Sequence, residues 1–218
     1  MRLLEVIIIV VFFLLSCEYV TDAEGEKQIG VVADSSVSKM EEERRSVKTL
    51  SLISFLDAPI DLQKYKKSKN NQYTTTSVSN KKDYYFQPKI ENAIYYTYYY
   101  SSESVKDSKR IDQVIVFKHG ENKHVYNDET EILIELRVFN NDSDLGEANL
   151  VGLTKGELES RFGSDYLLSN NRLIYSDKNK VLIIKLNGSK VKAYYYIKLN
   201  TEKLDANFIG QLIKQSQL

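Results

Sequence analysis

The sequence has no tryptophan, only 2 prolines and a single cysteine among its 218 residues. One cysteine permits no disulfide within the chain, so packing alone must hold the fold together. Its 30 basic residues are balanced by 30 acidic residues, and a chain without excess positive charge lacks the basic face expected of a nucleic-acid-binding protein. With 42% hydrophobic residues, most of the chain should nevertheless fold around a core. We therefore expect a packed domain and no nucleic-acid partner.

The amino-terminus has no apolar run of transmembrane length. Val6–Leu15 is unbroken and apolar, but a spanning helix needs about 20 such residues. A short run after a positive start has the length of a signal-peptide core. It ends in Leu14-Leu15-Ser16-Cys17, which resembles the bacterial lipobox, with leucine three residues before cysteine and a small residue directly before it.

The lipobox resemblance implies a processed and lipidated protein. In that family the chain is cut before the cysteine, whose thiol is acylated. Residues 1–16 would then be the signal peptide, and Cys17 would anchor the protein to a membrane of the bacterial cell envelope, on the periplasmic or the outer surface. The alternative is an uncut signal anchor in which Cys17 is an ordinary residue.

Residues 17–46 are polar, with a charge cluster at 41–45 and little apolar periodicity. This composition predicts a flexible tether that leads to a folded domain at 47–218. The domain is either single or divided into subdomains at 47–145 and 146–218. We expect an α+β fold, a mainly antiparallel sheet with a few short helices packed on one face.

Tyrosine is abundant, with 16 residues, and aromatic residues favour strands. The run Val47–Leu56 is apolar and ends before Pro59, but its pattern does not separate helix from strand. Lys64–Lys82 is polar and basic, which favours a loop with one exposed edge strand. Strands are expected at 84–86, 94–100, 111–118, 132–139, 172–175, 181–186 and 191–199, with a short helix as the alternative for 132–139.

The last third carries the clearest local signals. Thr154 and Glu157 have the spacing of a capping box, and Gly163 is a natural helix end. Asn187-Gly188 predicts a tight hairpin turn between two strands. The strand 191–199 alternates so as to give one apolar face and one wetter face, and an amphipathic helix is expected at 201–215.

The stretch from Gly152 to Gly163, GLTKGELESRFG, followed by a strand and a hairpin, resembles the small outer-membrane lipoproteins of the SmpA/OmlA type. The resemblance covers Val151 to Leu199. Those lipoproteins usually have a proline soon after the helix-ending glycine, where this chain has Ser164-Asp165. The resemblance implies an envelope scaffold or binding module and agrees with the lipobox.

Tyrosine clusters provide the candidate partner-binding residues. Tyrosine gives a large, rigid contact area at low entropic cost, so one face of these strands could recognise a protein, or stack on sugar rings. The alternative is that the rings pack in the core and over the sheet. The candidate residues are Tyr96, Tyr98, Tyr100, Tyr194 and Tyr196.

The sequence offers little for catalysis or metal binding. His119 and His124, with Glu121 between them, are the one histidine pair that could share a metal, but loop histidines are usually solvated. We therefore expect no metal, no cofactor and no enzymatic activity. The expected function is a lipid-anchored envelope protein that binds another protein as a scaffold. The alternatives are an immunity or inhibitor lipoprotein that neutralises a toxin or hydrolase, and a glycan-binding module or hydrolase.

Overall fold

The computed structural model describes residues 33–69, 73–78, 84–90, 94–100, 111–216 and 218. The described residues from Met40 onward form one compact unit. The predicted signal peptide and Cys17 lie outside the described residues. Within the described ranges, no helix is both long and apolar enough to cross a bilayer.

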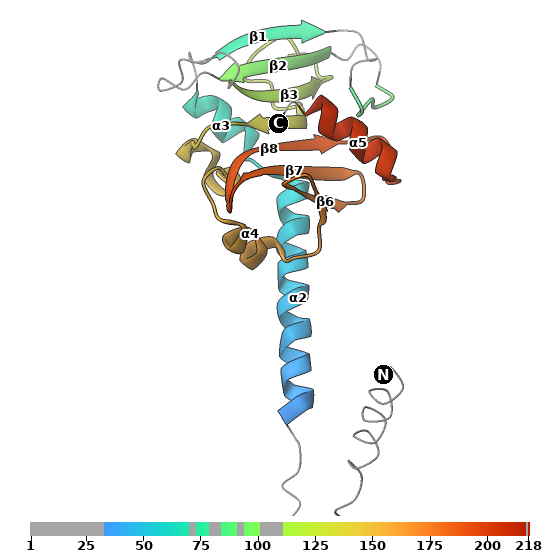
Figure 1. The fold of residues 1–218 in the computed structure, drawn as a ribbon. Coiled ribbons are helices and arrows are strands. Elements are labelled where there is room, and N and C mark those ends of the chain that lie inside the picture. The colour runs from blue at the N-terminus through green and yellow to red at the C-terminus, as the bar shows by residue number, and fades with distance from the viewer. Residues whose placement is uncertain (1–32, 70–72, 79–83, 91–93, 101–110, 217) are drawn as a thin grey trace, which may run out of the picture. The chain divides into compact units, whose positions relative to one another are not determined.

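The described residues form an α+β fold dominated by one antiparallel sheet of eight strands, which confirms the predicted fold class (Figure 1). The helices are α2 (Ala33–Asp57), α3 (Leu62–Ser68), the 3-10 helix η3 (Ser143–Ala148), α4 (Lys155–Phe162) and α5 (Ala206–Gln215). The strands are β1 (Tyr73–Val78), β2 (Ile94–Tyr100), β3 (Asp112–Lys118), β4 (Ile132–Val138), β5 (Leu167–Ser169), β6 (Arg172–Asp177), β7 (Lys180–Asn187) and β8 (Lys190–Lys198).

The sheet consists of two meanders joined edge to edge, in the order β1-β2-β3-β4-β8-β7-β6-β5. The joint is the β4–β8 pair, which runs from Glu135 opposite Ile197 to Val138 opposite Tyr194. This pair crosses the suggested subdomain boundary at 145/146, and residues 40–218 form one compact unit.

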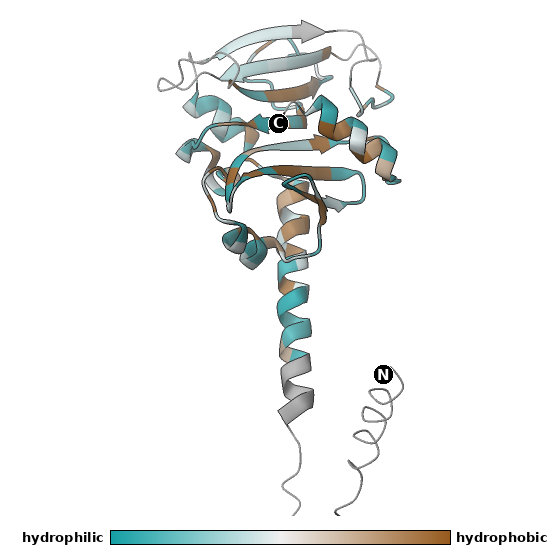
Figure 2. Ribbon diagram, viewed as in Figure 1, coloured by the Kyte–Doolittle hydropathy of each residue, from teal (hydrophilic) through white to brown (hydrophobic). Residues whose placement is uncertain are grey.

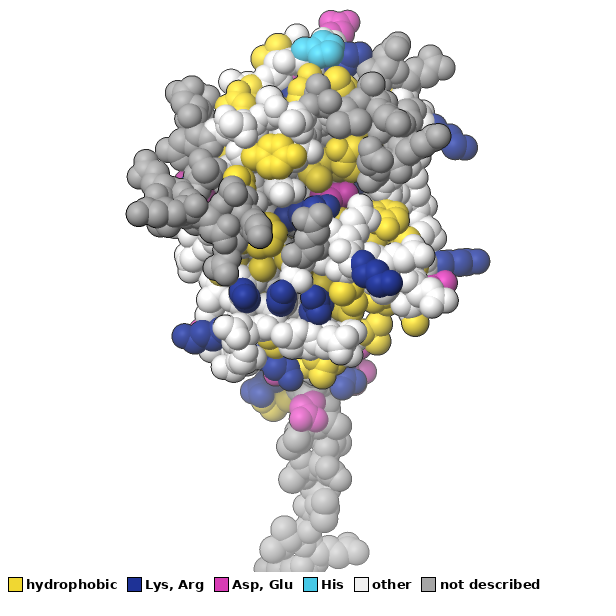
Figure 3. Space-filling model, turned by 45° about the horizontal axis from the view of Figure 1, so that its top comes forward, with side chains coloured by type: hydrophobic (Ala, Val, Ile, Leu, Met, Phe, Trp, Pro, Cys, Tyr) yellow, Lys and Arg dark blue, Asp and Glu magenta, His cyan; other side chains and the backbone are white. Residues whose placement is uncertain are grey.

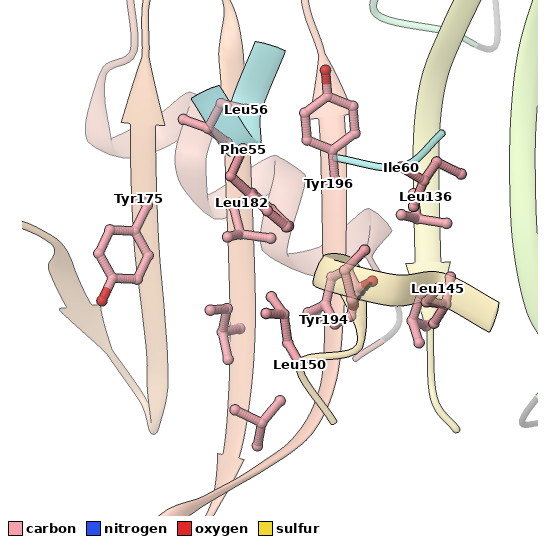
Figure 4. Packing of buried hydrophobic residues seen from close by; sticks show 14 of the residues in the cluster. Phe55, Leu56, Ile60, Leu136, Leu145, Leu150, Tyr175, Leu182, Tyr194 and Tyr196 are labelled. Carbon is pink, nitrogen blue, oxygen red and sulfur yellow. Dashed lines mark hydrogen bonds between the residues drawn. The ribbon is translucent and has the colours of Figure 1, made fainter. Parts of the chain in front are cut away.

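One face of the sheet is covered by α2, α3, η3 and α4. Phe55 and Leu56 of α2 enter a core that also contains Leu136 of β4. Figure 4 shows Tyr194 and Tyr196 of β8 among the aliphatic side chains of this cluster. Apolar residues concentrate on the strands and on the C-terminal turns of α2, whereas the turns before them are hydrophilic (Figure 2). Burial of these side chains is the main favourable term for the fold.

The opposite face is covered by α5. Ile209 and Leu212 of this helix are buried with Tyr195 and Ile197 of β8. The helices therefore lie on both faces rather than on one. The predicted wetter face of β8 is wrong at Tyr194 and Tyr196, which are buried in the first cluster, whereas Lys190 and Lys192 are exposed as expected.

Local signals in the last third are confirmed. The Thr154 hydroxyl accepts from the Glu157 amide at 3.2 Å, and Glu157 accepts from the Thr154 amide at 2.6 Å, which completes the capping box. Gly163 has φ +82° at the end of α4, a region that favours glycine. The predicted hairpin joins β7 to β8, but its two turn residues are Gly188 and Ser189, because Asn187 pairs with Lys190. The closing helix begins later than expected, at Ala206, with Asp205 as its N-cap.

Several expected boundaries are corrected. The helix α2 begins at Ala33, inside the predicted tether, because the Glu- and Arg-rich cluster at 41–45 consists of good helix formers. Residues 47–56 are helical, which settles the open alternative. The expected loop at 64–82 contains α3, which Asp61 caps by accepting from the Lys64 amide at 3.0 Å, and the predicted edge strand, which is β1.

The segment Tyr84–Phe86 is not a strand. Pro88 follows closely, and proline cannot donate to a sheet ladder. Tyr84 instead stacks on Tyr95 with ring centroids 4.5 Å apart. The other predicted strands are present, and residues 132–138 form a strand rather than a short helix.

Candidate functional site

Four of the five candidate tyrosines are buried. The exposed fractions are 2% for Tyr98, 3% for Tyr100, 0% for Tyr194 and 2% for Tyr196. All four belong to the core cluster under the helices, so they cannot present their rings to a partner. Their assignment as surface residues is wrong because both faces of the sheet are covered. Tyr96 alone is half-buried.

A buried charge cluster lies beside these rings. Lys66 of α3 donates to the Glu131 carboxylate and to the main-chain oxygen of Tyr126. Lys118 of β3 donates to the main-chain oxygen of Val125 at 2.6 Å, and its Nζ lies 3.3 Å from Glu131 Oε2. The side chains of Lys66, Lys118 and Glu131 are at most 1% exposed. One carboxylate thus serves two enclosed ammonium groups.

Tyrosine rings form the walls of this cluster. Lys66 Nζ lies 4.6 Å from the ring centroid of Tyr126 and 5.1 Å from that of Tyr98. Lys118 Nζ lies 5.2 Å from the ring centroid of Tyr96. Tyr73 stacks on Tyr126 at 4.0 Å. Ammonium groups at these distances are attracted by the negative faces of the rings, more strongly where water is excluded.

The cluster is built to hold charge inside the domain. Burial lowers the pKa of the Lys66 ammonium, and Glu131 opposes that effect. Asp128 adds a second carboxylate, whose pKa is lowered by its bonds to Thr130 and by the two lysines, although burial acts the other way. Gln63 Nε2 donates to Glu131 at 2.8 Å and to the Asp128 main-chain oxygen at 2.9 Å. These contacts join α3, β3 and the loop 119–131 into one unit.

Because these contacts join α3, β3 and the loop 119–131 inside the domain, the cluster of Lys66, Lys118 and Glu131 is a structural brace for these elements. Its accessible side is Tyr96, whose hydroxyl lies 3.0 Å from Nδ1 of the exposed His124. His119 is also exposed and lies 5.9 Å from the Phe117 ring. Within the described ranges, no group of three His, Cys, Asp or Glu side chains could hold a metal ion.

The strand next to this brace is the edge of the sheet. Among the described residues, β1 pairs with β2 alone, from Tyr73 opposite Tyr100 to Val78 opposite Tyr95. Its central residues, Thr74 to Thr76, are exposed, and the strand contains neither charge nor proline. The opposite edge, β5, has only three residues. Short or charged strands protect a sheet edge from pairing, and β1 has neither protection.

Two further polar clusters lie in the core. Arg137 Nη2 donates to Glu135 Oε2 at 3.0 Å on the α5 side, and burial raises the pKa of the Glu135 carboxyl. Asp112 Oδ1 accepts from the Phe139 amide at 2.7 Å and from Asn140 Nδ2 at 3.1 Å. Burial raises the pKa of Asp112 to about 6, against the effect of these bonds.

A pocket of approximately 560 Å³ lies on the surface, between the loop that precedes α3 and the helix η3. Its walls carry both signs of charge, including Asp61, Lys64 and Asp144. Lys69 pairs with Asp142 at 2.9 Å and with Asp144 at 2.7 Å near this wall. Because acidic and basic side chains both line the pocket, its charge does not favour an anionic or a cationic ligand.

Sequence reasoning missed the buried charges. Glu135 and Arg137 could have been noticed, because they stand two residues apart within an otherwise apolar strand and so share one face. Lys66, Lys118 and Glu131 come from separate polar segments, and no local pattern brings them together. The edge strand β1 was expected, but the absence of charged side chains from it was not noticed.

Comparison with known proteins gives no match, either to a family model, to a curated protein or to a solved structure. The lipobox and the resemblance to the SmpA/OmlA type therefore stay predictions.

Proposed function

We propose that this chain is a lipid-anchored protein of the bacterial cell envelope whose folded domain binds an extended segment of a partner protein. The lipid would be attached at Cys17, and the partner would pair with the outer side of β1. The observation that carries the binding proposal is the exposed and uncharged edge of that strand.

The helix α2 supports a role in holding the domain away from its anchor. Residues 40–50 are exposed on nearly every side, and packing begins only near Leu52. Most of these side chains are charged or polar, with Met40, Val47 and Leu50 as the exposed apolar exceptions. A largely polar helix that contacts no core is typical of a solvent-exposed spacer. Each ten residues of such a helix extend the spacer by about 15 Å.

Strand addition needs an open row of main-chain donors and acceptors. An edge strand offers this row, and an extended peptide that pairs with it gains main-chain hydrogen bonds. Threonine is favoured in strands and can form cross-strand hydroxyl contacts. The brace of Lys66, Glu131 and Lys118 supports the neighbouring strands, so the edge would be held ready for pairing.

The anchor is tested by metabolic labelling with a fatty-acid analogue. We expect the parent chain to be labelled and Cys17→Ala to be unlabelled and released from membranes. Persistent labelling of Cys17→Ala would contradict lipidation at this residue, without bearing on β1.

The binding edge is tested by photo-cross-linking in intact cells, with the cross-linker placed at Thr75 or at the exposed Gln211 of α5. We expect a discrete adduct from Thr75 that Gln211 does not give. A lysine at a sheet edge discourages pairing, so Thr74→Lys should remove the adduct, whereas Gln211→Lys should leave it. Identical adducts from both positions, or none from Thr75, would rule out partner binding at β1. An adduct with one toxin or hydrolase would favour the immunity alternative.

A further inference from the structure

The hairpin of β7 and β8 is rich in lysine and has no carboxylate. Residues 178–201 contain six lysines and no aspartate or glutamate, in a chain whose formal net charge is zero. Lys180 pairs with Asp57, and Lys198 lies 4.6 Å from the Phe86 ring centroid. Lys190 lies near enough to Glu157 to lower the pKa of its carboxyl. Lys185 and Lys192 form no ion pair with a described residue.

Three cations meet at one end of this hairpin. Arg172 of β6 lies directly opposite Lys185 of β7, and Lys185 lies opposite Ala193 of β8. A bulge follows, because Leu186 pairs with Val191 and leaves Lys192 as the extra residue. Bulges redirect side chains, and neighbouring strands are about 4.8 Å apart. Arg172, Lys185 and Lys192 thus form a basic patch across three adjacent strands.

The charges in the basic patch act on one another. The pKa of the Lys185 ammonium is lowered by burial, then by Arg172 and Lys192, and no carboxylate contributes. Arg172 donates from Nη2 to the Leu218 main-chain oxygen at 2.8 Å and from Nη1 to the Asn170 oxygen at 3.2 Å. These bonds fix the guanidinium. Lys185 and Lys192 have no counter-ion among the described residues.

We propose that the basic patch of Arg172, Lys185 and Lys192 binds a phosphate group. Lysine and arginine donate charge-assisted hydrogen bonds to phosphate oxygens, and an anion would relieve the repulsion among three adjacent cations. Figure 3 shows Lys and Arg side chains side by side in a row, with no Asp or Glu side chain among them, on the face that it views. The phosphate could belong to a soluble compound or to a lipid headgroup, since both present the same oxygens.

Binding is tested first with inorganic phosphate. The full chain, purified in neutral detergent, is titrated at constant ionic strength while the backbone amide NMR signals of β6, β7 and β8 are followed. We expect saturable shifts centred on Lys185 and Lys192, and an affinity about tenfold lower in the double variant Lys185→Gln/Lys192→Gln. The exposed Lys203 provides the matched control, because Lys203→Gln removes one surface charge elsewhere. Unsaturable shifts, or equal affinity in the double variant and the control, would overturn the site.

The two sources of phosphate are separated with vesicles of neutral phosphatidylcholine, with or without anionic phosphatidylglycerol. The apolar leader contributes equally to binding of both kinds of vesicle, so the readout is the increase in vesicle binding when phosphatidylglycerol is added. A gain that the double variant loses and Lys203→Gln keeps identifies a lipid headgroup. No such gain, with inorganic phosphate still bound, identifies a soluble phosphate. Failure of both probes refutes the proposal, and thermal unfolding of each variant verifies that it is folded.

Discussion

Asp112 stands at the start of β3, buried and doubly hydrogen-bonded through Oδ1. Burial raises the pKa of this carboxyl from 3.8 to about 6 in the folded protein. The folded state therefore binds more protons than the unfolded state between these pH values. Stability from this group is present at low pH and is lost as the pH rises towards about 6.

Asp112→Asn removes this titration while keeping an acceptor oxygen. Between pH 4 and pH 7, we expect the difference in unfolding free energy between variant and parent to shift in favour of the variant by about 1–3 kcal/mol. Urea unfolding of both proteins across this range measures the shift. A difference that is the same at pH 4 and pH 7 would show that folding does not raise the pKa of Asp112.

Glu131 is the shared partner of two enclosed lysines, and its substitution should lower the unfolding free energy strongly. Glu131→Gln leaves Lys66 and Lys118 without their nearest counter-ion, and breaking a buried pair in this way costs about 3–5 kcal/mol. The partly exposed surface pair of Lys155 and Glu159, 3.5 Å apart, is the control. Lys155→Gln should leave the unfolding midpoint close to that of the parent, because solvent screens this pair. Equal unfolding midpoints for the two variants would contradict a buried, charged cluster.

At the scale of elements, α4 depends on its cap. Thr154 and Glu157 satisfy each other's main-chain amides at the helix start. Thr154→Ala should lower the unfolding free energy by about 1 kcal/mol, whereas Thr154→Ser, which keeps the hydroxyl, should stay close to the parent. Chemical denaturation of the three proteins decides this. If Ser is as damaging as Ala, the methyl group rather than the hydroxyl carries the effect.

The helix α2 changes character along its length. Its turns before Leu52 are exposed, and its last turns pack against the sheet through Phe55 and Leu56. Short helices without tertiary packing are marginal in water, so amides of 40–48 should exchange hydrogen faster than those of 52–56. Mass-spectrometric hydrogen exchange on the full chain measures both. Comparable protection along the helix would indicate that another surface covers its exposed turns.

Elements with a strong local signal could be predicted from sequence, and those held by distant contacts could not. The capping box of α4, the hairpin turn after Asn187 and the aromatic strand β2 all follow from neighbouring residues. The seven residues of α3 are polar and basic, and the helix is fixed by Lys66 and Tyr65, whose partners lie far along the chain. Nothing in the local pattern marks it as packed.

At the scale of the molecule, the sequence left open how many sides of the sheet are covered. Tyr194, Tyr195 and Tyr196 are all buried, so adjacent rings point into opposite cores. A run of tyrosines is compatible with an exposed surface and with a buried core. The positions of α2 and α5 determine which of the two these tyrosines occupy. For this reason the sequence indicated aromatic candidates, of which Tyr96 alone lies near the surface.

The β4–β8 joint has a consequence for how the chain is made. β4 lies between β3 and β8, yet β8 follows it only after the chain from Ser143 to Asn187 has been synthesised. Until then one edge of β4 is unpaired, and Leu136 lacks the part of its core cluster that the second meander supplies, which invites aggregation. The nascent protein should therefore depend on a holding chaperone until its final hairpin has emerged, and the second meander, made of consecutive strands, is the half suited to form first.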